Sequence, residues 1–96
     1  MKNYNEYLKV GDQIKLNKIV NELEEIMLLN ELQMDKYDND TCLKKVIELN
    51  NIFYQLLDLK NETIAHDNYE LYSECESYCV TLQSQMAQLR SKYMNV

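Results

Sequence analysis

The chain has almost none of the residues that interrupt helices or close tight turns. Its 96 residues include one glycine, no proline and no tryptophan. Because β-hairpins depend on glycine-rich turns, a sheet is not expected, and the abundant Leu, Glu, Lys and Gln favour helices. A chain of this length has room for one core but not for an additional catalytic domain. The composition predicts an all-α fold, with residues 1–96 forming a single helical-bundle domain.

Basic charge is also scarce. Ten Lys and Arg stand against sixteen Asp and Glu, which gives a net charge of −6 and a pI near 4.7. Binding to a phosphate backbone or to anionic lipid requires clustered cationic side chains. We therefore expect no direct nucleic-acid partner and no membrane partner.

Long apolar runs are missing as well. The longest run, residues 26–29, has four residues, whereas a membrane-spanning helix needs about 20 and a signal peptide about 7 to 15. Three cysteines without an export signal indicate reduced thiols rather than a disulfide framework. These features predict an intracellular protein, either cytoplasmic or nuclear.

The clearest pattern that is present lies in the last third of the chain. Apolar or thiol side chains follow one another there at alternating spacings of three and four: Tyr72, Cys75, Cys79, Leu82, Met86, Leu89 and Tyr93. This heptad seam predicts one long helix over about residues 68–94, roughly 40 Å in length at ~1.5 Å per residue. A helix of that length needs others beside it. We predict an elongated three-helix antiparallel bundle with coiled-coil packing.

Two earlier helices are predicted at about residues 13–36 and 42–60. The second is apolar around more than half of its circumference, which is typical of a buried central helix. A polar segment joins the two, with Asp40 or Thr41 as the N-cap, and residues 61–67 form the next connection. The pattern leaves open whether a true loop separates the last two helices. Residues 1–12 are ambiguous, with Asp12 as a possible second N-cap.

The first predicted helix has a second apolar surface. Leu28, Leu29 and Leu32 lie within one turn, on the side away from its main stripe. Since a three-helix monomer cannot easily bury both faces of an outer helix, we predict a protein interface here, which also includes Ile52 and Leu59. The alternative is that the N-terminal segment folds over the leucines.

Few residues suggest chemistry. Cys75 and Cys79 are four apart on a helix and could supply thiolates to a zinc ion, together with His66 and Cys42. Their place in the heptad seam instead favours a structural role as small buried apolar groups. His66 lies in a predicted turn and is expected to be solvated. We therefore expect no enzymatic activity, no cofactor and no metal.

Two asparagines interrupt the core stripes. Asn30 lies amid the apolar residues of the first helix and Asn50 amid those of the second. In a hairpin centred near residue 39, positions whose numbers sum to about 78 lie opposite each other. We predict that these amides are neighbours, or that each bonds across to a partner helix, and so fix the helix register. Hydration at the stripe margins is the alternative.

These features together predict a small acidic protein-protein interaction module, such as an adaptor, regulator or complex subunit. It would bind a protein partner, a second copy of itself as a homodimer, or both. An alternative is an acidic inhibitor that mimics nucleic acid and presents exposed carboxylates to a DNA-binding protein. The carboxylates are those of Glu22, Glu24, Glu25, Glu31 and Asp35. A metal or redox sensor that uses Cys75 and Cys79 is the least favoured.

Overall fold

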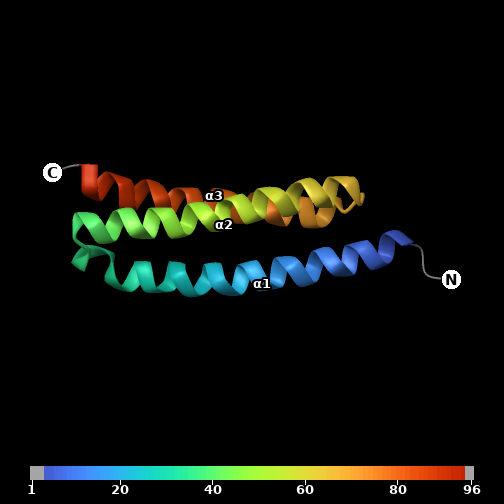
Figure 1. Ribbon diagram of the computed structural model, residues 1–96, viewed down its shortest axis with the longest axis horizontal. Helices are drawn as coiled ribbons and strands as arrows, with labels where there is room; N and C mark the ends of the chain where they lie inside the picture. The colour runs from blue at the N-terminus through green and yellow to red at the C-terminus, as the bar shows by residue number, and fades with distance from the viewer. Residues whose placement is uncertain (1–3, 95–96) are drawn as a thin grey trace.

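The computed structural model describes the backbone of residues 4–94 and the side chains of residues 6–92. Nearly all of these residues lie in helices: α1 (Tyr4–Gln33), the 3₁₀-helix η1 (Met34–Lys36), α2 (Asn39–Ala65) and α3 (Tyr69–Met94). The described part of the chain contains no strand. The predicted all-α fold is confirmed (Figure 1).

Successive helices run antiparallel and form an elongated bundle (Figure 1) that measures 59 × 18 × 16 Å. Its radius of gyration is 15.7 Å, whereas a compact domain of this length would have about 12.5 Å. The closest pair is α2 and α3, which lie side by side, and α1 makes fewer contacts with either of them. The first helix is therefore the outer member of the bundle.

The core is a column of leucines and cysteines. Its buried apolar side chains are Leu16 and Leu23 from α1, Cys42, Val46, Leu49, Ile52, Leu56 and Leu59 from α2, and Leu71, Cys75, Cys79, Leu82, Met86 and Leu89 from α3. Because α2 and α3 supply most of these residues, they form the main packing surface. The central helix is less enclosed than predicted, since Leu43, Ile47 and Tyr54 are exposed on its outer side.

The first helix starts earlier than the sequence suggested. It begins at Tyr4, and the backbone continues without a break through Gly11, whose φ angle is negative. Asp12 is not an N-cap: it lies inside α1, and its side chain is buried. The N-terminal segment therefore extends α1 and does not fold over the leucines of its C-terminal half.

A tight connection joins α1 to α2. The first helix ends in η1, where the Tyr37 amide donates to the Met34 carbonyl. The N-cap of α2 is Asp38, whose carboxylate accepts from the Thr41 amide at 2.8 Å, so the prediction of Asp40 or Thr41 was wrong. Hydrogen bonding by the Thr41 side chain, and next by the Thr41 amide, stabilises the charged carboxylate and lowers the pKa of Asp38.

The second connection is much shorter than predicted. Helix α2 continues through Ala65, which leaves only residues 66–68 between α2 and α3. Asp67 adopts a left-handed φ of 56°, and the amide of Asn68 closes the helix end by donating to the Thr63 carbonyl at 2.8 Å. Aspartate tolerates this conformation better than most residues other than glycine. The chain therefore reverses direction here without a glycine.

Candidate interaction surface

The predicted interface residues separate into two groups. Leu28, Leu29 and Leu32 have exposed fractions of 58%, 41% and 68%. Ile52 and Leu59 are only 1% and 2% exposed, so their prediction as interface residues was wrong. Both face the inside of the bundle from α2, which is covered on this side by the neighbouring helices. Only the three leucines of α1 are available to a partner.

The geometry of α1 explains why these leucines face outward. Buried side chains recur along this helix at Leu16, Leu23 and Asn30, seven residues apart. Positions two residues before and five residues after these residues point to the opposite side of the helix, because each residue turns the helix by ~100°. Ile14 lies two residues before Leu16 and is 64% exposed, and Leu28 lies five residues after Leu23 and is 58% exposed. The leucines thus belong to the face of α1 that is directly opposite the core.

That outward face carries apolar side chains at both ends of α1. We call this set the outer stripe: Tyr7, Val10, Ile14, Leu28, Leu29 and Leu32, each at least 41% exposed. Between its two ends the face is polar, with Asn17, Lys18, Asn21 and Glu25. Tyr7 and Val10 lie in the segment that the sequence left unassigned, and Ile14, although inside the first predicted helix, was not recognised as part of its outward face. The signal that could have placed them was their spacing from Leu28: Tyr7, Val10 and Ile14 lie 21, 18 and 14 residues before it, each close to a whole number of turns.

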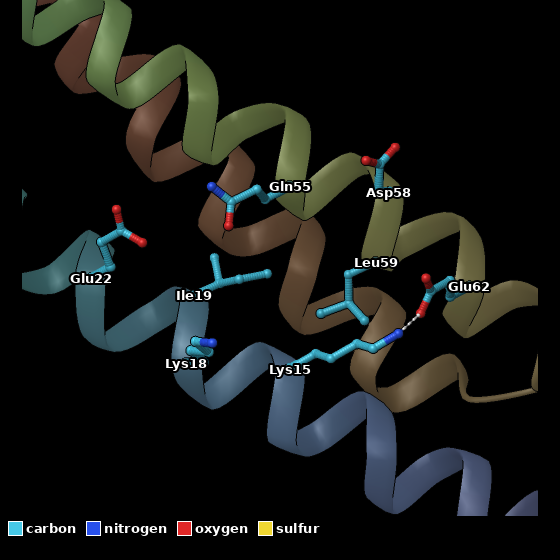
Figure 2. A pocket seen from close by; sticks show the side chains of 8 residues that line it. All are labelled: Lys15, Lys18, Ile19, Glu22, Gln55, Asp58, Leu59 and Glu62. Atoms are coloured by element: carbon cyan, nitrogen blue, oxygen red, sulfur yellow. Dashed lines mark hydrogen bonds and ion pairs between the residues drawn. The ribbon is translucent and has the colours of Figure 1, made fainter.

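A shallow hollow lies between α1 and α2 on another side of the bundle (Figure 2). Its volume is about 320 Å³, and its lining residues are Lys15, Lys18, Ile19, Glu22, Gln55, Asp58, Leu59 and Glu62. Lys15 donates to the Glu62 carboxylate at 2.7 Å, which raises the pKa of the lysine. Both side chains of this pair are largely exposed, so it contributes little to stability. The hollow is therefore a shallow groove between two helices, with an ion pair at one end.

The heptad seam of α3 lies in the core. Cys75, Cys79, Leu82, Met86 and Leu89 are buried, and Tyr72 is half-buried with the Lys60 ammonium 5.0 Å from its ring centre. The side chain of Tyr93 lies outside the described residues. Burial raises the pKa of the Cys75 thiol to about 11, and it also raises the pKa of Cys79. Both thiols are therefore uncharged at neutral pH, which is the less reactive form and the weaker metal ligand.

The buried amide of Asn30 has a partner on α3. Its Nδ2 donates to Gln85 Oε1 at 2.9 Å, and its Oδ1 accepts from the Tyr37 hydroxyl at 2.8 Å. The Gln85 amide in turn donates to the Met27 carbonyl. The neighbour of Asn30 is thus Gln85 and not Asn50, which is half-buried on the α2–α3 side of the bundle. Of the two predicted arrangements for Asn30, the bond across to another helix is the one observed.

A second buried polar cluster links α1 to the turn before α3. Asp12 is 1% exposed, and both of its carboxylate oxygens lie within 3.0 Å of His66 Nδ1. The side-chain amide of Asn68 also donates to Asp12, at 3.4 Å. The prediction of a solvated His66 was wrong, because only 22% of its side chain is exposed. The cluster holds the N-terminal half of α1 against the far end of the bundle.

The described residues were also compared with the requirements of a metal site and of a membrane-spanning helix. Within the part of the chain that the structure describes, no group of three or more His, Cys, Asp or Glu side chains is arranged to hold a metal ion. None of the described helices is long and apolar enough to cross a membrane.

Comparison with protein-family models, with curated proteins and with solved structures found no match. The geometry of the chain itself therefore carries the functional argument.

Proposed function

We propose that this protein is a small interaction module that binds another polypeptide through the outer stripe of α1. The observation that carries the proposal is the exposure of Ile14, Leu28 and Leu32, each more than half exposed on the face opposite the core. Exposed apolar side chains that align on one helix face are typical of protein contact sites. Burying them against a partner would remove them from water.

The buried cysteines do not support a sensor. Cys75 and Cys79 are 0% and 7% exposed, and their raised pKa values keep them as thiols at neutral pH. A redox or metal sensor requires accessible thiolates. The two cysteines instead fill the core between α2 and α3.

The alternative of nucleic-acid mimicry is less well supported. The five candidate carboxylates are all exposed, but four of them lie on different sides of α1, interspersed with exposed leucines, and that of Asp35 lies in η1. A mimic of a phosphate backbone would need carboxylates in continuous rows on one face. Mimicry would give binding that weakens steeply with salt, whereas burial of the outer stripe would depend little on ionic strength.

A double substitution in the stripe tests the proposed function. Leu28→Glu with Leu32→Glu places two charges where apolar area would be buried, so partners that co-purify with the wild-type chain from its native cell should be lost. The matched control is Glu24→Gln with Glu31→Gln, which changes exposed charge on the same helix and should retain them. Helicity by circular dichroism should be the same in all three proteins. Retention of every partner by the leucine variant would refute the proposal.

A further inference from the structure

Four of the six residues of the outer stripe are placed symmetrically about Asn21, whereas the positions that mirror Tyr7 and Leu29 are the polar Asp35 and Gln13. Ile14 lies seven residues before Asn21 and Leu28 lies seven after it, while Val10 and Leu32 lie eleven before and eleven after. All four apolar side chains are between 58% and 68% exposed, and Asn21 is exposed between them. Such a pattern superimposes on itself when the helix is turned end to end. It is the pattern of a surface that fits its own copy across a two-fold axis.

We propose that the occupant of the outer stripe is a second copy of this chain, with the two α1 helices packed antiparallel about a two-fold axis near Asn21. The inference rests on the proposed function and specifies its partner. With the axis near Asn21, residues whose numbers sum to 42 lie directly opposite each other in this pair, and residues whose numbers sum to about 39 to 45 lie within one helical turn of each other. The apolar N-terminal end of each stripe then covers the apolar C-terminal end of the other, and the two Asn21 amides meet near the axis. A polar pair of this kind fixes the register of paired helices.

Charge favours the antiparallel orientation. At the same register, Lys18 of one copy lies within one helical turn of Glu22, Glu24 and Glu25 of the other, and all four side chains are exposed. A parallel pair would instead place Lys18 beside Lys18 and Glu25 beside Glu25. Opposite charges beside an apolar seam select the orientation in which they face each other, and like charges disfavour the other one.

The single glycine of the chain also fits this arrangement. Gly11 has a helical backbone, and nothing lies within 4 Å of the position that a Cβ atom would occupy. The monomer fold therefore has no need of glycine here, although glycine destabilises a helix interior relative to alanine. In the antiparallel pair, Gly11 lies opposite Leu28 and Leu29 of the second copy. The missing side chain leaves room for those leucines.

The surface is large enough for a reversible dimer. Burying the exposed parts of six such side chains on each copy, with the polar rim around them, would remove roughly 1,000 to 1,300 Å² of surface in total. Specific complexes bury about 1,200 to 2,000 Å², so this interface lies at the lower end of the range. We therefore expect a dimer that forms at tens of micromolar chain and dissociates on dilution.

The first test is the mass of the purified wild-type chain in solution. Light scattering or sedimentation should show a shift from the monomer mass of 11.5 kDa to twice that value as the concentration rises. A chain that remains monomeric up to millimolar concentration would overturn the proposal of a second copy. If such a monomer still lost its cellular partners through the leucine substitutions, the proposed function would stand with a different partner.

A charge design tests the orientation. Ile14→Lys with Leu28→Glu places opposite charges face to face in the antiparallel pair but like charges together in a parallel one, so this variant should still dimerise. The matched control, Ile14→Glu with Leu28→Glu, creates repulsion in either orientation and should weaken association at least tenfold. Circular dichroism should show that both variants retain wild-type helicity. Equal loss of dimer in both folded variants would overturn the antiparallel arrangement.

Disulfide trapping provides a second test with smaller substitutions. A chain with Ile14→Cys and a chain with Leu28→Cys should form a covalent heterodimer when mixed and oxidised. Each chain alone should cross-link much less, because residue 14 does not face its own copy in the antiparallel pair. The native cysteines are buried, so the wild-type chain serves as the background control. Efficient cross-linking of either single variant with itself would overturn the proposed register.

Discussion

At the residue scale, the buried polar side chains show where sequence reasoning ends. The position of Asn30 in an apolar stripe predicted that its amide would need a partner, and the amide is indeed buried with two. The sequence could not identify Gln85, which lies 55 residues away, because periodicity assigns a face to each residue but not the neighbour of that face. The same reason explains His66: its predicted turn was correct, but its contact with Asp12 depends on how the helices meet.

The raised pKa of Cys75 predicts how stability changes at alkaline pH. Below pH 9 the thiol is protonated in both the folded and the unfolded chain. Between its ordinary pKa of 9.0 and its folded value of about 11, the unfolded chain loses this proton first, so the free energy of unfolding falls as pH rises. The rise in pKa from 9.0 to about 11, at about 1.4 kcal/mol per pKa unit, sets an upper limit of about 3 kcal/mol on this loss above pH 11.

The measurement is urea unfolding from pH 7 to pH 11. Cys75→Ala should be less stable than the wild type at pH 7, through lost packing, but should lose less stability as the pH rises. Met86→Leu changes another core side chain of α3 without removing a thiol and should keep the wild-type slope. Parallel curves for the wild type and Cys75→Ala would show that this thiol does not titrate as its burial requires.

At the scale of single elements, the sequence predicted which segments are helical but not where each helix begins and ends. The spacing of Leu16, Leu23 and their neighbours predicted α1, and the heptad seam predicted α3, because side-chain periodicity is a local property. The boundaries failed where local signals were overridden. A glycine inside a helix costs only about 1 kcal/mol relative to alanine, and Asp12 is engaged by His66, so α1 continues through the apparent start at Gly11 and Asp12.

The buried hydrogen bond between Asn30 and Gln85 joins α1 to α3, which leads to a further prediction. Asn30→Leu alone leaves the Gln85 carbonyl oxygen without its buried donor and should destabilise the fold by about 1 to 3 kcal/mol. Adding Gln85→Leu removes the unpaired group, so the double variant should recover much of this loss. A double-mutant cycle from urea unfolding measures the coupling between the two positions.

The control for this cycle pairs Asn50→Leu with Gln85→Leu. Asn50 lies on the α2–α3 side of the bundle, away from the hydrogen bond between Asn30 and Gln85. Its coupling to Gln85 should therefore be within about 0.5 kcal/mol of zero. If the Asn30 and Gln85 effects were simply additive, the pair would not be a determinant of register.

At the scale of the whole molecule, fold class and elongated shape followed from composition and helix length, while the assignment of surfaces followed only in part. The leucines of α1 were correctly separated from its core stripe. Ile52 and Leu59 were wrongly assigned to an interface. Helix α2 is apolar on several sides, and its sequence does not indicate which of these sides α1 and α3 cover. Tyr7 and Val10 could be assigned to the outer stripe only because the structure extends α1 back to Tyr4. Ile14 lay inside the predicted helix, but its exposure follows from the packing of the bundle.

The unequal packing of the three helices predicts that the bundle opens in steps. Among the side chains that the structure describes, helix α1 contributes two to the buried apolar core, Leu16 and Leu23, and it is held at its two halves by the polar contacts of Asp12 and Asn30. A unit with fewer buried contacts opens at lower free energy than the rest. In hydrogen exchange at concentrations where the chain is monomeric, amides of residues 16–30 should exchange at least about tenfold faster than those of residues 46–60 and 75–89. His66→Ala should accelerate exchange in α1 further without changing α3, because it leaves the buried Asp12 without its main partner. Uniform protection across all three helices would instead mean that the bundle unfolds as one cooperative unit.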